Sequence, residues 1–594
     1  MHNKTKLLIF ASLLLAACST DPMQEIPNRG DSAPEIETSD KICNTSDDAV
    51  AGSLIVKFGE EAIPSLEQNA LNAAKTRSAL TRSGIESVDD ILNDLHVTSL
   101  ERVFPEAGEH EARTRAAGLH RWYVLGFASE EDLDKAAERL ADVAEISKVQ
   151  FRTRLYRASD CKTYPFQATA NGQTRALVTA DFNDPNLFWQ WHYINNADQA
   201  VATTSVAGAD INVADAWKLT AGNPEVIVAI VDEGVKYTHP DLAANMWINP
   251  NPSPEYGKQD IHGWNFVTDG PISTHVAGTV AAVNNNGIGV CGVAGGTGKG
   301  DGVRLMSCQI FSGDLTGDAL VSSRAVKYAA DHGASILQCS WGIKAGIYTS
   351  DNMFIKQSPM DYEALQYFAA QKNCEALDGG LIIFSAGNES TAMSGYPAGY
   401  RDYISVTSFS PDYLPANYTN YGPGCNIAAP GGETSGLSGG EKAGVLSTLC
   451  SETSNGADYG YMQGTSMACP HVSGVAALGL SYALEKGKRF SLDEFKTMLL
   501  TSVNEIDSRL GEGSKATIAD VSIYRGKMGT GITDAYQLLM QIEGTPSAGR
   551  IGRGAAHSAD AAFRAGCRRP YLHRYPDVGQ GHGKAWHQGG SQNV

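Results

Sequence analysis

From Asp184 onward, short uninterrupted apolar runs alternate with longer segments of helical periodicity. Such runs are typical of parallel strands that are buried on both faces, because crossover helices cover the sheet. The alternation predicts an α/β fold with a parallel sheet and helices on both faces, whose active site lies at the carboxyl ends of the strands. The expected strands are residues 226–231, 334–339, 381–384 and 403–407, and the expected helices are residues 319–332, 361–377 and 466–485.

The first eighteen residues are organised as an export signal. Lys4 and Lys6 precede an apolar run, 7–17, that is too short to span a bilayer. The run ends in Leu15-Ala16-Ala17-Cys18, which resembles the lipobox of bacterial lipoproteins and implies cleavage before Cys18 and acylation of that residue. The alternative is a plain secretory signal with a chance cysteine. We expect an exported protein, lipid-anchored through Cys18 at the bacterial cell envelope, in the outer membrane or at the cell surface.

Composition divides the rest of the chain into four parts. Residues 19–50, rich in Asp, Glu, Pro, Ser and Thr, predict a flexible tether. Residues 51–157 predict a small α+β domain, with a helix over 130–143 that Ser129 opens. The α/β domain is expected over 184–545. Residues 546–594 are basic and lack an apolar period, so no fold is assigned to them; a partner-binding tail and a shifted reading frame both remain open.

Charge and cysteine spacing exclude several functions. Lys+Arg 47 against Asp+Glu 66 gives a formal charge of -19, so nucleic acid is not an expected partner. None of the cysteines forms a C-x-x-C pair, and no metal site is predicted. The Gly-rich segment 292–302 lacks the G-x-x-x-x-G-K-[ST] pattern of phosphate-binding loops, which excludes that class of nucleotide site.

Three polar motifs lie next to predicted elements of the α/β domain. Two of them follow a strand and one opens a helix. Asp232-Glu233-Gly234 ends the first strand, where a carboxylate could orient an imidazole or simply form a turn. Ser385-Ala-Gly-Asn388 places an amide at another strand end, able to donate to an oxyanion or to cap a turn. Gly464-Thr-Ser466-Met-Ala-Cys-Pro-His-Val-Ser-Gly474 opens a helix. Ser466 there is either a structural cap or a nucleophile beside the positive end of the helix dipole.

Together, the order of these motifs resembles that of the subtilisin-like serine proteases (subtilases), over roughly residues 184–541. The resemblance implies that Asp232 orients the base, Ser466 attacks the scissile carbonyl and Asn388 donates to the oxyanion. It also implies that Ser340, Trp341 and Gly342 pair with the substrate backbone, and that residues 51–157 correspond to the family's propeptide. Calcium is possible by resemblance, although no ligands can be assigned, and no other cofactor is expected.

The chain departs from the family at the catalytic histidine. The family motif is His-Gly-Thr-His-Val-Ala-Gly-Thr, with its first His catalytic, whereas residues 270–279 read Gly-Pro-Ile-Ser-Thr-His-Val-Ala-Gly-Thr. His275 therefore aligns with the second His, and Ile272 stands at the position of the base. His275 lies one turn further along, about 4.5 Å by helix geometry. A base must approach the serine hydroxyl to about 3 Å. As a substitute base, His275 would require the helix to slide by one turn.

Two functions follow. The first is a serine endopeptidase of the subtilisin class that hydrolyses protein or peptide substrates, impaired as written because a short segment with the catalytic His is missing. The second is a catalytically inactive surface lipoprotein that binds peptides in the substrate groove. The retained Asp232, Asn388 and Ser466 favour the first.

Overall fold

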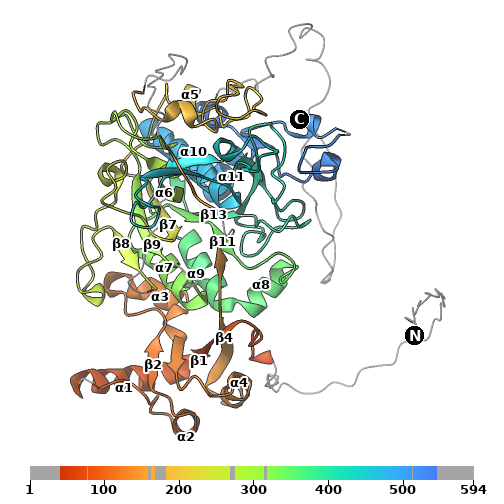
Figure 1. The fold of residues 1–594 in the computed structure, drawn as a ribbon. Coiled ribbons are helices and arrows are strands. Elements are labelled where there is room, and N and C mark those ends of the chain that lie inside the picture. The colour runs from red at the N-terminus through yellow and green to blue at the C-terminus, as the bar shows by residue number, and fades with distance from the viewer. Residues whose placement is uncertain are drawn as a thin grey trace, which may run out of the picture.

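The computed structural model of the chain describes residues 40–76, 78–157, 162–167, 182–267, 275–312, 317–511 and 513–544. The predicted signal peptide with Cys18, most of the predicted tether, Ile272 and the tail 546–594 lie outside the described residues. In Figure 1 the described chain forms a small unit from its N-terminal part and a larger unit from the remainder.

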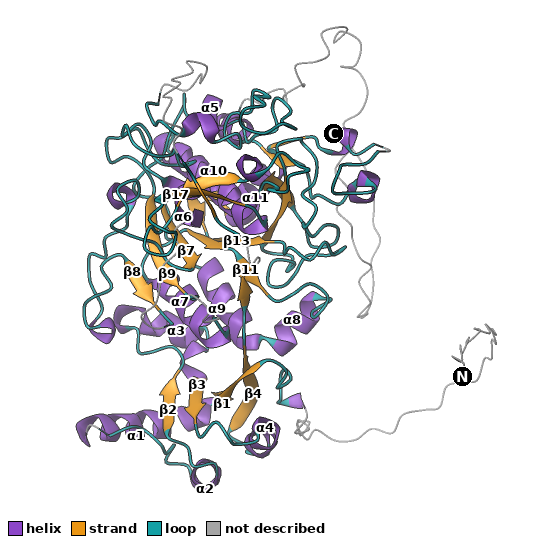
Figure 2. Cartoon of the chain, viewed as in Figure 1, coloured by secondary structure: helices purple, strands orange, loops and turns teal. Residues whose placement is uncertain are grey.

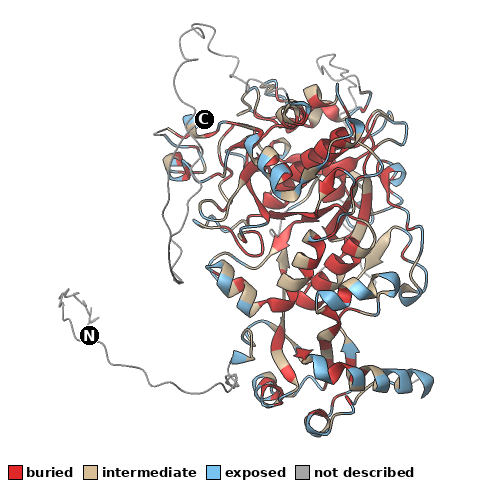
Figure 3. Ribbon diagram, turned by 180° about the vertical axis from the view of Figure 1, so that it is seen from behind, coloured by how far each residue is buried: buried red, intermediate tan, exposed pale blue. Residues whose placement is uncertain are grey.

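An antiparallel four-stranded sheet, ordered β2-β3-β1-β4, forms the small unit. Leu54, Val56 and Leu125 of this sheet pack with Leu66 and Leu140 of the covering helices in a core of their own. The elements are β1 (Ala49–Phe58), α1 (Ile63–Thr76), α2 (Glu86–Asp94), β2 (Ser99–Arg102), α3 (Glu111–Ala116), β3 (Trp122–Gly126), α4 (Leu133–Ala141) and β4 (Ile146–Thr153). Figure 3 shows that α1 is mostly exposed.

Two boundaries of the small unit differ from the sequence prediction. Helix α4 begins at Leu133, because the carboxylate of Asp132, and not Ser129, accepts the N–H of Lys135. The ordered chain also begins before residue 51. The backbone N–H of Cys43 donates to Val149 O at 2.9 Å, so part of the polar segment predicted as a tether pairs with β4.

The larger unit is built on a nine-stranded sheet, ordered β19-β20-β15-β14-β13-β10-β7-β9-β8. Neighbouring strands are parallel except at one edge, where β19 runs antiparallel to β20. The strands are β7 (Ile227–Asp232), β8 (Gly263–Asn265), β9 (Arg304–Gln309), β10 (Ile336–Cys339), β13 (Leu381–Ser385), β14 (Ile404–Phe409), β15 (Ile427–Pro430), β19 (Val503–Asn504) and β20 (Ile532–Thr533).

Helices cover both faces of this sheet (Figure 2). Alternate residues of β7 enter different cores: Val228 and Ile230 pack on the side of α6, α10 and α12, whereas Ala229 and Val231 pack on the side of α7 and α9. Burial on both faces explains the uninterrupted apolar run and confirms the predicted fold class. The helices are α6 (His275–Ala281), α7 (Ala319–Asp331), α9 (Pro359–Ala369), α10 (Thr465–Glu485) and α12 (Ala535–Glu543), and the larger unit also contains α5 (Val213–Ala216), α8 (Asp351–Gln357) and α11 (Leu492–Thr501).

One predicted helix is shorter than expected. The sequence predicts a helix over 361–377, but α9 ends at Ala369. The side-chain amide of Asn373 donates to Ala330 O at 2.8 Å and to Ala334 O at 3.0 Å, so the chain turns toward the end of α7. It then forms β12 (Leu377–Asp378), which pairs with β18 (Phe490–Ser491).

Helix α10 runs through the core of the larger unit. Among the described residues, it is the one helix long and apolar enough to cross a membrane, and it is almost wholly buried within the molecule. Its apolar composition is accounted for by contacts with β10, β13, β14 and β15 on one side and with α6 and α12 on the other.

The face of the small sheet that its own helices leave uncovered packs against α7 and α9 of the larger unit (Figure 1). Ile55 and Trp122 of the small unit share a core with residues of these helices. Ion pairs surround the contact: Lys57 with Glu363 at 2.6 Å, Arg113 with Asp331 at 2.7 Å and Arg152 with Asp318 at 2.7 Å. In each pair the small unit supplies the cation and the larger unit the carboxylate.

Candidate active site

Asp232, His275 and Ser466 line one cavity of about 220 Å³. They come from three elements: Asp232 ends β7, His275 begins α6, and Ser466 is the second residue of α10. The carboxyl end of a parallel strand and the amino ends of two helices therefore meet there, as the fold class predicts. The sequence motifs of Asp232 and Ser466 are brought together although 234 positions separate them.

Asp232 holds a buried carboxylate. One oxygen accepts the N–H of Glu233 at 2.8 Å, and the other is buried without a hydrogen-bond partner among the described residues. Burial, followed by the neighbouring charge of Glu233, raises the pKa of Asp232 to about 7. The carboxylate thus has a free acceptor, as the orientation of an imidazole requires. Gly234 follows at φ 90°, where a Cβ would lie 2.9 Å from the Gln309 side chain.

Ser466 is held at the start of α10. Gly464 caps the helix at φ 143°, a conformation that favours glycine. The Ser466 hydroxyl lies 3.5 Å from Ser340 O, and the Ser340 hydroxyl donates to Ser466 O at 2.9 Å. In the first turn of a helix the hydroxyl is close to backbone N–H groups that have no partner within the helix, which suits a nucleophile whose product is an oxyanion.

Asn388 follows β13, and its side chain contacts the first residue of α10. Its side-chain oxygen accepts two hydrogen bonds from Thr465, while its NH₂ group is buried without a partner among the described residues. A buried donor without an acceptor is unfavourable unless something else receives it. The Asn388 oxygen is thus bonded to the residue that precedes Ser466, and its NH₂ group is left without an acceptor among the described residues.

His275 is tied to the neighbouring sheet. Its Nε2 donates to Val445 O at 3.0 Å, and its own carbonyl accepts the Ser447 hydroxyl at 2.7 Å. Burial lowers its pKa to about 4, so the ring is neutral at pH 7. Among the described residues, its Nδ1 has no hydrogen-bond partner, and no hydrogen bond joins His275 to Asp232 or Ser466. Ile272 lies outside the described residues.

A strand of the chain itself pairs with the rim next to Ser340. β11 (Trp341–Gly342) pairs antiparallel with β5 (Tyr156–Arg157), so that Trp341 faces Arg157 and Gly342 faces Tyr156. The indole N–H of Trp341 donates to Val231 O at 2.9 Å, which anchors this rim to β7. Within the described residues Trp341 and Gly342 thus pair with a strand of the same chain, and their pairing with a substrate backbone stays a prediction.

A second segment of the chain lies on the other side of the cavity. β6 (Tyr164–Pro165) pairs with β17 (Tyr459–Met462), which in turn pairs with β16 (Val445–Thr448). Thr163 lines the same cavity as Asp232 and Ser466. The aromatic pair Tyr164 and Phe166 is the sequence signal for this segment, because both side chains pack against the main core.

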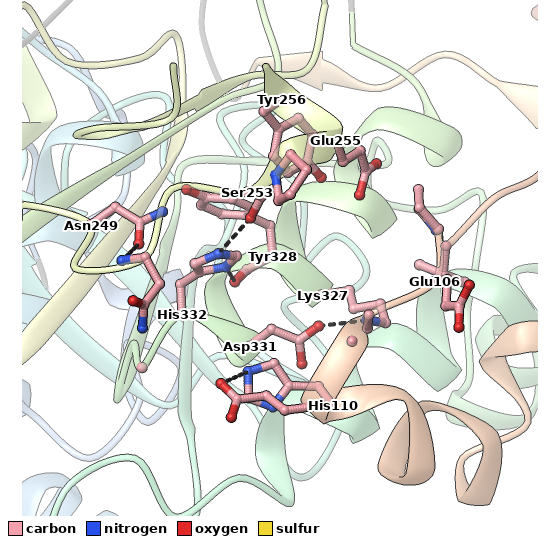
Figure 4. Close-up of a pocket in the computed structure, with 18 of the residues that line it drawn as sticks. Glu106, His110, Asn249, Ser253, Glu255, Tyr256, Lys327, Tyr328, Asp331 and His332 are labelled. Atoms are coloured by element: carbon pink, nitrogen blue, oxygen red, sulfur yellow. Dashed lines mark hydrogen bonds and ion pairs between the residues drawn. The ribbon is translucent and has the colours of Figure 1, made fainter. Parts of the chain in front are cut away.

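A larger cavity of about 750 Å³ lies at the junction of the two units, away from these residues. Figure 4 shows His110 of the small unit facing Asp331 and His332 of the larger one. The His332 ring stacks on Tyr328 at 3.9 Å. The cavity contains none of the residues that the sequence motifs identify.

The described residues contain no group of three or more His, Cys, Asp or Glu side chains that could hold a metal ion. Asp184 and Asp241 are buried near one another, but their oxygens accept N–H groups: Asn285 donates to Asp184 at 2.7 Å and Val290 to Asp241 at 2.9 Å. Their oxygens are thus already engaged, and calcium remains without assigned ligands.

Comparison with known proteins places these observations in a family. Residues 223–517 match the profile described as Peptidase_S8, the subtilase family. The chain is 30% identical over 275 residues to thermitase of Thermoactinomyces vulgaris, covering 45% of this chain and 79% of thermitase. It is 29% identical over 323 residues to halolysin of Haloferax mediterranei, covering 53% of this chain but only 49% of halolysin. The chain thus spans about half the length of halolysin.

A solved structure supports the fold alone. The crystal structure of fervidolysin from Fervidobacterium pennivorans, described as a keratinolytic enzyme related to subtilisin, aligns with a TM-score of 0.50 at 18% identity. The alignment covers 84% of this chain and 62% of that one.

Proposed function

Because the chain belongs to the subtilase family, we propose that it is a serine endopeptidase of the subtilisin class, impaired in the sequence as written. The observation that carries the proposal is the shared cavity of Asp232 and Ser466, together with Asn388, whose side-chain oxygen is bonded to the adjacent Thr465 and whose NH₂ group has no partner among the described residues. Ser466 attacks the scissile carbonyl, Asn388 and the start of α10 stabilise the oxyanion, and Asp232 orients the base. Protein or peptide chains that pair with Ser340, Trp341 and Gly342 are the substrates.

The proposed loss of activity comes from the missing general base. Ile272 aligns with the catalytic His, and an aliphatic side chain cannot accept the serine proton. Removing the base from subtilisin lowers kcat by a factor on the order of 10⁶. Among the described residues, His275 is the imidazole that lines this cavity. Its Nε2 donates to Val445 O, so it would have to act through Nδ1 or break that bond.

The small unit is proposed to be a propeptide. Its last strand, β5, lies on the rim that a substrate would use, and Thr163 re-enters the catalytic cavity shortly afterwards. We expect the propeptide to be removed by cleavage within residues 155–185. The N-terminal sequence of the mature protein tests this position.

Export and lipid anchoring complete the proposal. Two relatives carry names that state secretion: the extracellular basic protease of Dichelobacter nodosus and the halolysin-like extracellular serine protease Nep of Natrialba magadii. The signal-like start of this chain, with Cys18, supports attachment to the cell envelope rather than release.

The second candidate is a peptide-binding lipoprotein without catalysis. It is favoured by one observation: the groove holds an extended strand while the only described imidazole in the cavity is engaged with Val445 O. Labelling with a fluorophosphonate distinguishes the two, since the probe reports an activated serine. Labelling of the purified full chain or of its Ile272→His variant, lost in Ser466→Ala, supports the peptidase. A folded protein that does not label even as Ile272→His supports the binding protein.

A further inference from the structure

Arg157 and Glu233 form an ion pair across the two units. Arg157 ends the described strand β5 of the small unit, and Glu233 directly follows Asp232. The Arg157 guanidinium also lies over the ring of Phe311, 5.7 Å from its centroid. Arginine combines ion pairing and stacking on aromatic rings in this way, and a neutral side chain of similar length does not.

The backbone register fixes where this cation sits relative to the nucleophile. Arg157 pairs with Trp341, one residue from Ser340. Ser340 O lies 3.5 Å from the Ser466 hydroxyl. Any peptide that replaces β5 on this rim in the same register would therefore direct one side chain toward Glu233.

We propose that Glu233 and Phe311 form a subsite that selects a basic side chain in the substrate, at the position that pairs with Trp341. This inference rests on the proposed function and specifies its substrate class as peptides with Arg or Lys at that position. Glu233 and Arg157 are both partly shielded from solvent, with side chains 20% and 34% exposed. A carboxylate in this setting rejects an acidic residue more strongly than a fully solvated one would.

The ion pair of Arg157 and Glu233 also influences Asp232, the proposed catalytic carboxylate. After burial, the charge of Glu233 is the largest influence that raises the pKa of Asp232, and Arg157 opposes it. A basic side chain in the subsite therefore favours the ionised Asp232 that orients a base. A neutral or acidic residue leaves the Glu233 charge uncompensated beside Asp232.

Hydrogen exchange of the full chain tests the contact without any need for catalysis. In a Ser466→Ala background, which prevents processing, we compare Glu233→Gln, Arg157→Gln and the double variant. We expect amides of residues 155–157 to exchange about five- to tenfold faster in each single variant, with no further increase in the double variant. Glu452→Gln is the matched control, because its carboxylate pairs with Lys236 beside the same cavity. Equal exchange in all variants would overturn the proposal.

Cleavage provides the second arm. Peptides with the sequence of residues 153–162 and Arg, Lys, Gln or Glu at the position of Arg157 are offered to the Ile272→His variant with Ser466 intact, because the unaltered chain has Ile at the position of the base. We expect kcat/KM to be about tenfold higher for Arg and Lys than for Glu, and Glu233→Gln to remove the difference. A chain that cleaves none of them contradicts the proposed peptidase, and the exchange measurement still decides the subsite. Cleavage without preference contradicts the subsite alone.

Discussion

The side-chain oxygen of Asn388 accepts both the backbone N–H and the hydroxyl of Thr465, at 2.9 and 2.8 Å. Thr465 directly precedes Ser466, so these two bonds orient the Asn388 NH₂ group relative to the nucleophile. That NH₂ group is buried and has no partner in the described part of the chain. Such a donor contributes little to the stability of the protein without substrate, and it is available when negative charge develops on a bound carbonyl.

Restoring an imidazole at residue 272 should restore activity. We expect Ile272→His to raise the hydrolysis of a fluorogenic peptide by at least about tenfold, because the acceptor for the serine proton returns. Ser273→His is the matched control, since it adds an imidazole one residue away from the aligned position. An equal gain in both variants would contradict the alignment that places the base at residue 272.

The role of Asn388 can be measured in the Ile272→His chain. We expect Asn388→Ala to lower kcat by about 10²- to 10³-fold with little change in KM, because its donor acts on the transition state. Thr465→Val removes one of the two bonds that orient the amide, and a smaller loss is expected. A rise in KM at constant kcat would argue against the oxyanion role.

His275 should make stability depend on pH. Its pKa is lowered from 6.5 in the unfolded chain to about 4 by burial. The unfolded state therefore takes up the proton first, and the contribution is complete above pH 6.5 and lost as pH falls toward 4. This loss amounts to at most about 3 kcal/mol.

Denaturant unfolding at pH 7.5 and 4.5 measures this contribution. His275→Gln should reduce the difference between the two pH values, because its side chain does not titrate. His239→Gln serves as a comparison, since the lowered pKa of His239 comes from burial at a separate position. An unchanged pH dependence in His275→Gln would show that other groups control it.

The contact between the two units depends on the partly buried carboxylate of Glu363 more than on exposed ion pairs. Glu363 accepts bonds from Lys57 at 2.6 Å and from the Trp122 indole at 2.8 Å. We expect Glu363→Ala to destabilise the contact by about 3 kcal/mol or more, because Lys57 would remain buried and unpaired. Glu67→Ala, which removes the half-exposed pair with Arg115, should cost at most about 1 kcal/mol. Protection of the small unit from added trypsin reports the difference.

The lipid anchor has its own test. We expect Cys18→Ser to abolish incorporation of an alkyne-labelled fatty acid and to move the protein from the membrane fraction to the soluble fraction, because the acylated thiol is lost. Cys43→Ser is the control, as it removes the next cysteine along the chain. Fatty-acid labelling that persists in Cys18→Ser would contradict the lipobox assignment.

The sequence alone determined the parallel sheet, its two helical layers and three residues at its strand and helix ends. Continuous apolar runs such as 226–231 arise only where both faces are buried, and the short motifs around Asp232, Asn388 and Ser466 are local in sequence. Local patterns are sufficient for such elements, because the backbone and its near neighbours dictate them. The shorter α9 was not predictable in the same way, because its end depends on bonds from Asn373 to the residues around α7.

Only the tertiary structure decided which strand pairs with the rim beside Ser466 and which partner each polar group has there. The pairing of Arg157 with Trp341, the ion pair of Arg157 with Glu233, and the bond from His275 to Val445 each join residues far apart in sequence. The periodicity of the sequence and the spacing of its motifs do not predict such contacts. They form because folding brings distant hydrogen-bonding and charged groups together under burial, where each must find a partner.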